Sequence, residues 1–168
     1  TIPLIKSNNH EKINQKKIQI DNIKKINFYK NKIYNGYKNT KYFKFYEKEF
    51  FSIYEKNYEL LIDLNLQLIY FFLDKLEINT KIIRSSTFNL TKKKSDLILE
   101  ICKIMKATKY LSGLSGKNYL NLKSFDKENI KVIFQNYKYP QFNKNFKFPN
   151  LSTIDMLFRL GPNAKKFI

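Results

Sequence analysis

The residues best suited to chemistry form a short loop of small side chains directly after a strand-like run. The loop is Ser112-Gly113-Leu114-Ser115-Gly116-Lys117, and it holds two of the four glycines of the chain. Glycine lets the backbone approach a ligand, and free backbone amides beside a lysine could hold a phosphate or a carboxylate. The spacing is not that of a P-loop. A strand-ending turn that binds nothing explains the same residues equally well.

A second group of candidates, Arg84, Ser85 and Ser86, closes another predicted strand. Only two arginines stand against thirty lysines, which favours a role for Arg84 that lysine cannot fill. A salt bridge to a helix end is the simpler alternative. Gln135 and Tyr137 follow a further predicted strand. Because loops at the carboxyl ends of strands bind ligands in open α/β sheets, these side chains could meet the same space.

No metal site, hydrolase nucleophile or cofactor motif is indicated by the sequence. The single histidine, His10, stands in a polar turn without a cysteine or second histidine to share a metal. The single cysteine, Cys102, falls on the apolar stripe of a predicted helix, which favours a structural role and excludes an internal disulfide. The Gly-x-Ser-x-Gly pattern of hydrolases is also absent from the sequence.

Hydrophobic residues alternate along some segments of the chain and recur at helical intervals in others. The predicted strands are Thr1–Lys6, Lys17–Asp21, Thr80–Arg84, Lys109–Leu111 and Lys131–Gln135. The predicted helices are Asn22–Tyr34 with a stop at Gly36, Tyr42–Tyr54, Leu60–Leu76, Leu97–Met105, a single turn at Ser124–Asn129, and a helix from Ser152 to Gly161 and Pro162. This order predicts one α/β domain over residues 1–168, with a largely parallel sheet and flanking helices, as an incomplete Rossmann-like domain.

Two of the predicted helices should form much of the core. Tyr42–Tyr54 carries aromatic residues at helical spacing, a pattern that normally faces a core. Lysines between these aromatic residues leave base stacking as an alternative. Leu60–Leu76 is apolar on most sides, which predicts a central helix.

The last predicted helix has recognisable boundaries. Ser152 is expected to be its cap, with Asp155 completing a capping box and Leu151 stapled to Met156. Asp155 and Arg159 stand four residues apart and are expected to form an ion pair.

The net charge of +18 invites a nucleic-acid interpretation, which the composition disfavours. The excess of Lys, Asn, Ile, Phe and Tyr is typical of codons rich in A and T, and a phosphate-binding surface would more often use arginine. No run reaches the length of a membrane span; Leu60–Leu76 comes nearest, but charged and amide residues interrupt it. With no signal peptide at its start, the chain is expected in the cytoplasm.

Short motifs recur in the order and spacing of one known family. They are Asp63-Leu64-Asn65, Arg84-Ser85-Ser86, Ser95-Asp96-Leu97-Ile98, Tyr110-Leu111-Ser112-Gly113-x-Ser115-Gly116-Lys117-x-Tyr119-Leu120, Phe134-Gln135-x-Tyr137, Pro149-Asn150-Leu151-Ser152, Asp155-x-Leu157-Phe158 and Gly161-Pro162. In this order they resemble the WbqC-like family, bacterial proteins linked to cell-surface polysaccharide. The resemblance is densest from Thr80 to Pro162 and adds Tyr119 and Asn150 to the candidate site residues.

The resemblance implies a role in O-antigen or lipopolysaccharide biosynthesis. The implied reaction transfers an aminoacyl group, such as glycine, or an acyl group to an amino sugar. A sugar or nucleotide sugar would then be the substrate, and the donor would be activated by a nucleotide or phosphate.

The chain departs from the family pattern at several points. The amino-terminal His-Gln-Pro segment of the family does not occur, so the chain is expected to match the carboxy-terminal two-thirds of a family member. Ser115 replaces a usual glycine, and Ile26 and Tyr139 stand where histidines are usual. Two alternatives stay open: a basic nucleic-acid-binding module, and an inactive remnant of a split gene.

Overall fold

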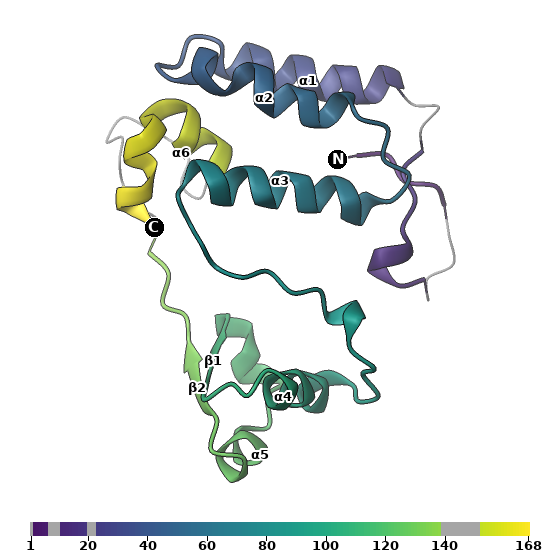
Figure 1. Cartoon of the computed structure of the whole chain (residues 1–168), viewed down its shortest axis with the longest axis vertical. Helices are drawn as coiled ribbons and strands as arrows, with labels where there is room; N and C mark the ends of the chain where they lie inside the picture. Colours follow the sequence, from purple (N-terminus) through teal and green to yellow (C-terminus); the bar gives the residue numbers. More distant parts are fainter. Residues whose placement is uncertain (1, 7–10, 20–22, 139–151) are drawn as a thin grey trace. The chain divides into compact units, whose positions relative to one another are not determined.

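The computed structural model describes residues 2–6, 11–19, 23–138 and 152–168 of the chain (Figure 1). The chain divides into two compact units. Unit 1 comprises Thr1–Thr80 and Gln141–Ile168, and unit 2 comprises Lys81–Pro140. Unit 2 is therefore an insertion between the two sequence segments of unit 1, so unit 1 is completed only when the end of the chain returns to it.

Unit 1 is helical in the residues that the structure describes. Its elements are a 3-10 turn at Ile13–Gln15, α1 (Ile23–Tyr37), α2 (Phe43–Glu55), α3 (Leu61–Lys75), α6 (Thr153–Leu160) and a 3-10 segment at Gly161–Phe167. These positions confirm the predicted helices, although α1 continues through Gly36, where a stop was expected.

The two strands predicted near the amino end are shorter than expected. Antiparallel bridges join Leu4 to Ile18 and Lys17 to Leu60. Backbone bonds at 2.8 Å from Ile18 N to Glu59 O and at 2.9 Å from Leu61 N to Lys16 O continue this pairing. The segment around Ile18 is thus extended and paired on both sides, but it forms isolated bridges instead of a ladder.

The core of unit 1 is built from aromatic rings at helical spacing. Phe43, Tyr46 and Phe50 on α2 are all buried, as the periodicity predicts. Phe158 on α6 is completely buried against them, with ring centroids 5.2 Å from Phe43 and 5.5 Å from Phe50, both edge-on. Such edge-to-face pairs stabilise beyond the area that they bury, so α6 is held to α2 by geometry as well as by hydrophobicity.

The ends of α6 show why it docks where it does. Ser152 occupies the predicted cap position, but its side chain makes no capping bond. The backbone amide of Tyr42 donates to Phe158 O at 3.0 Å, which ties the start of α2 to α6. After α6 the chain turns at Gly161 with a φ of 57°, and a Cβ there would lie 2.5 Å from Tyr42 Cδ1. Only glycine therefore allows this approach.

One predicted interaction in α6 is confirmed. Arg159 Nε lies 2.8 Å from Asp155 Oδ1, and Asp155 is buried. The predicted staple between Leu151 and Met156 involves a residue outside the described part of the chain.

The prediction that Leu60–Leu76 forms a central helix is wrong. In α3 only Leu64 and Phe71 are fully buried, while Ile69 and Tyr70 are 43% and 48% exposed. The helix contacts α2 and the 3-10 turn Ile13–Gln15. One side of it is therefore exposed within unit 1.

Unit 2 contains the strands. Its elements are a 3-10 turn at Ser85–Thr87, α4 (Lys94–Ile104), β1 (Lys109–Ser112), a 3-10 turn at Leu114–Asn118, α5 (Leu122–Lys127) and β2 (Lys131–Phe134). β1 and β2 are parallel, with Lys109 opposite Lys131 and Ser112 opposite Phe134. The crossover between them runs through α5, as parallel strands require.

The predicted strand Thr80–Arg84 is wrong. This segment has no strand partner among the described residues, and Ile82 and Ile83 are exposed. Its β-branched run has the composition of a buried strand, but a strand also needs a neighbour with free backbone groups.

The fold is thus a helix-rich α/β arrangement with a small parallel sheet, which confirms the broad fold class. In the described part of the chain that sheet has two strands. The finer prediction of a Rossmann-like domain is not confirmed by a pair of strands.

Replacing Phe158 by Ala should lower the free energy of unfolding by about 3–5 kcal/mol, because a buried ring is removed from a close-packed site. The matched control is Phe45→Ala on α2, since Phe45 is 75% exposed; it should cost about 1 kcal/mol or less. Urea unfolding followed by far-ultraviolet circular dichroism measures both. Equal losses for the two variants would contradict the proposed role of Phe158.

Candidate functional site

The candidate loop leaves the sheet of unit 2 where both strands end. β1 ends at Ser112 and β2 at Phe134, and these residues are opposite one another in the parallel register. The amide of Gln135 donates to Ser112 O at 2.8 Å, so the first residue after β2 is bonded to the last residue of β1. The backbone of Gln135 therefore adjoins the first residue of the loop, and a shared ligand site stays a prediction.

The loop is closed by a contact between Ser112 and Gly116. Ser112 is only 1% exposed, and its hydroxyl donates to Gly113 O at 3.0 Å. A Cβ on Gly116 would lie 2.0 Å from Ser112 Oγ, so a side chain has no room there. Gly116 N donates to Gly113 O at 3.0 Å, and Leu120 N donates to Gly116 O at 2.9 Å. The glycine is needed for an approach to Ser112, whereas its sequence position suggested an approach to a ligand.

Positive charge and free amides accompany this turn. Lys117 Nζ lies 5.5 Å from the centre of the Phe134 ring, and no described carboxylate pairs with it. The amides of Leu114 and Ser115 likewise have no acceptor among the described residues. An exposed cation–π contact is weak, about 0.5–1 kcal/mol, so the ammonium group can turn toward an anion at little cost.

The second predicted group is not joined to this loop by any described contact. Arg84 precedes the 3-10 turn Ser85–Thr87, and its carbonyl accepts a hydrogen bond from Thr87 Oγ1 at 2.7 Å. Arg84, Ser85 and Ser86 are all exposed to solvent. Their participation in the same site stays a prediction.

The structure describes some of the remaining predicted site residues but not all of them. Tyr119 and Tyr137 are on the surface of unit 2, 51% and 60% exposed. Asn150 lies outside the residues that the structure describes.

A small hydrophobic core of unit 2 supports the loop. Phe125 and Cys102 are buried together with Ile130, and the Tyr110 ring stacks on Phe125 at 5.9 Å between centroids. Burial raises the pKa of the Cys102 thiol, which keeps it protonated at neutral pH. The predicted structural role of Cys102 fits this environment.

Two positioning residues were not among the predicted site residues. Ser95 is buried on α4, and its hydroxyl accepts the Asn121 amide at 2.9 Å, which fixes the chain just beyond the loop. The Glu100 carboxylate accepts the amides of Thr91 and Lys92 at 3.1 and 3.2 Å. The signal for Ser95 was its place in the Ser95-Asp96-Leu97-Ile98 motif, just before a predicted helix. Glu100 had no local signal.

Neither a metal centre nor a membrane helix is found where the structure describes the chain. No group of three or more His, Cys, Asp and Glu side chains is placed to bind a metal ion in those residues. None of their helices is both long and apolar enough to cross a membrane.

The site and fold define a helix-rich α/β protein whose small-residue loop lies at the ends of parallel strands. A model of the WbqC-like protein family matches residues 1–167, essentially the whole chain. The chain belongs to this family, which confirms the resemblance in its sequence motifs.

A curated relative extends the comparison. The chain is 30% identical over 97 residues to a protein of Mycobacterium tuberculosis (strain ATCC 25618 / H37Rv) named "Uncharacterized protein Rv1507c". The aligned region is 55% of this chain and 42% of the relative, so the chain matches less than half of that protein. No solved structure matches the chain.

Replacing Gly116 by Ala should destabilise unit 2 by about 1–3 kcal/mol, because the new methyl group overpacks against Ser112. The control is Gly113→Ala: Gly113 is extended, and a Cβ there meets nothing within 4 Å, so stability should be unchanged or slightly higher. Urea unfolding of the full chain, followed through NMR signals of β1 and β2, measures the difference. If Gly116→Ala is as stable as Gly113→Ala, the close contact with Ser112 is not a constraint.

Proposed function

We propose that this protein acts in bacterial cell-surface polysaccharide biosynthesis as a transferase of an aminoacyl or acyl group to an amino sugar. The observation that carries the proposal is the loop Ser112–Lys117 at the carboxyl ends of β1 and β2. It brings together a buried serine, a required glycine and a lysine that pairs with no carboxylate in the described residues. In open α/β sheets this is the edge that binds ligands. The family supplies the polysaccharide context.

The loop suits the anionic part of an activated donor. Lys117 and the amides of Leu114 and Ser115 can surround a phosphate or carboxylate. Gln135 is fixed beside them through its bond to Ser112 and could hold the sugar or the nucleotide. In this proposal Arg84 and Tyr137, which also belong to unit 2, contribute further contacts to the substrate, and the reaction takes place in the cytoplasm.

The reaction in this proposal is a nucleophilic acyl transfer. The amine nitrogen of the sugar attacks the carbonyl carbon of the donor, the new bond is an amide, and the bond from that carbon to the activating phosphate oxygen breaks. The phosphate leaves with its electron pair, and the nitrogen releases a proton to solvent. The loop would stabilise the leaving phosphate, whose negative charge increases as the bond breaks.

The test compares strains in which the gene is deleted and then restored as wild type, as Lys117→Ala or as Lys123→Ala. Lys123 is also an exposed lysine of unit 2 and serves as the control. Mass spectrometry of the surface polysaccharide should show the acyl or aminoacyl substituent lost on deletion, reduced at least about tenfold with Lys117→Ala, because a charged contact contributes about 1.5–3 kcal/mol, and normal with Lys123→Ala.

Two results would overturn parts of this proposal separately. An unchanged polysaccharide in the deletion strain excludes the transferase role. A polysaccharide that changes on deletion but is normal with Lys117→Ala keeps the role and excludes this loop as the donor site.

A further inference from the structure

Unit 1 contains a cavity that is separate from the loop of unit 2. It has a volume of about 260 Å³, and residues of the amino-terminal segment, α1, the end of α2 and α3 line it. Ile18 and Leu64 form a buried apolar part of its wall, with Ile2 and Ile26 beside them. An apolar cavity of about 150 Å³ already accepts benzene, so this one can hold an aliphatic or aromatic side chain with additional atoms.

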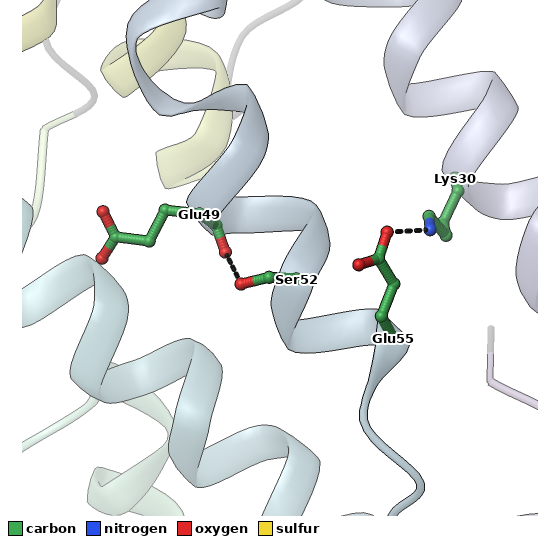
Figure 2. A network of polar contacts seen from close by, with 4 residues as sticks. All are labelled: Lys30, Glu49, Ser52 and Glu55. Atoms are coloured by element: carbon green, nitrogen blue, oxygen red, sulfur yellow. Dashed lines mark hydrogen bonds and ion pairs between the residues drawn. The ribbon is translucent and has the colours of Figure 1, made fainter.

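An ion pair is part of the same wall. Lys30 Nζ of α1 lies 3.1 Å from Glu55 Oε1 at the end of α2, and both residues line the cavity. Figure 2 shows the two side chains pointing toward one another across the space between their helices. The Lys30 side chain is 21% exposed and that of Glu55 64%, so the pair is open to solvent. An exposed pair of this kind contributes little to stability and can exchange partners easily.

Other polar groups surround this pair. Asn27, Lys56 and Asn57 also line the cavity and are exposed. The hydroxyl of Tyr58, a further lining residue, is buried without a hydrogen-bond partner among the described residues. An unpaired buried hydroxyl costs about 1–3 kcal/mol, so an acceptor brought in by a ligand would be favoured there.

The charges restrict the kind of ligand that fits. A carboxylate alone would compete with Glu55 for Lys30 and leave the Glu55 carboxylate unpaired beside it. An ammonium group alone would leave Lys30 unpaired in the same way. A ligand with both groups replaces the Lys30–Glu55 pair by two new pairs, and its apolar part then enters the cavity.

We propose that the cavity between α1, α2 and α3 binds a free α-amino acid with an apolar side chain. Lys30 binds its carboxylate, Glu55 binds its ammonium group, and Ile18 and Leu64 contact its side chain. This inference does not depend on the transferase proposal, because it concerns residues of unit 1 and a ligand that is not activated.

The experiment titrates the full chain with L-phenylalanine, 3-phenylpropionate and phenethylamine and follows binding by calorimetry and by ¹H–¹⁵N NMR. The three probes share a ring, but the second lacks the ammonium group and the third lacks the carboxylate. L-phenylalanine should bind saturably in the millimolar range or tighter. Each analogue should bind at least about tenfold more weakly, the change that follows from losing one charged contact.

Matched variants locate the site. Glu55→Gln should weaken binding of L-phenylalanine about tenfold and strengthen that of 3-phenylpropionate, because the competing carboxylate is removed. The control is Glu47→Gln on the same helix, because Glu47 pairs with Lys44 outside the cavity lining; it should leave both affinities unchanged.

Three outcomes would overturn the proposal. They are no saturable binding of L-phenylalanine up to its solubility, equal affinities for the three probes, and equal effects of Glu55→Gln and Glu47→Gln. Each is distinct from the outcome of the Lys117 experiment, which reads a loop in the other unit.

Discussion

The packing of the Phe158 ring against α2 is the interaction on which the arrangement of unit 1 depends. The chain leaves unit 1 after Thr80, forms all of unit 2, and returns with the segment that carries Phe158. Closing so long a loop costs conformational entropy, and a completely buried ring with several edge-on neighbours offsets it. The Tyr42–Phe158 backbone bond and the turn at Gly161 then fix how α6 lies on α2. The insertion can therefore form a separate unit without opening the core of unit 1.

Unit 2 has a separate core, which is built from fewer residues and supports the candidate loop. Two short parallel strands are covered by α4 and α5 through a core of Cys102, Phe125 and Ile130. Ser112 ends β1 and is buried, and Gly116 lets the following turn close over it. Buried contacts thus hold the loop in place, while the Lys117 ammonium group remains available to a ligand. Rigid support beside a lysine that pairs with no described carboxylate would suit an anion site.

The spacing of hydrophobic residues predicted much of the fold, because the buried face of a helix shows in the sequence as hydrophobic residues at helical intervals. The stripe of Phe43, Tyr46 and Phe50 predicted both α2 and its buried side, and the β-branched run at Lys131 predicted β2. The run Ile82-Ile83 has the same composition, but in the part of the chain that the structure describes no strand lies beside it, which composition does not reveal. The exposure of Ile69 and Tyr70 on α3 has a similar origin, since hydrophobic composition does not reveal which side of a helix has a neighbour.

The site was only partly predictable from the sequence. Glycines after a strand correctly indicated the loop, and the order of strands indicated that Gln135 would lie beside it. The contact between Ser112 and Gly116, the Ser95–Asn121 bond and the cavity beside Lys30 depend on side chains brought together by folding. Such contacts leave no periodic signal, so the structure was needed to find them.

Two separate cores hold the two candidate sites in this arrangement. Native-state hydrogen exchange of the full chain in increasing urea tests it most directly, because amides of one cooperative unit share an opening free energy. Amides of α2 and α6 should converge on one free energy and one urea dependence, and those of α4, β1 and β2 on a second. A single dependence for all of them, or α6 amides that follow β1 and β2 instead of α2, would contradict the account.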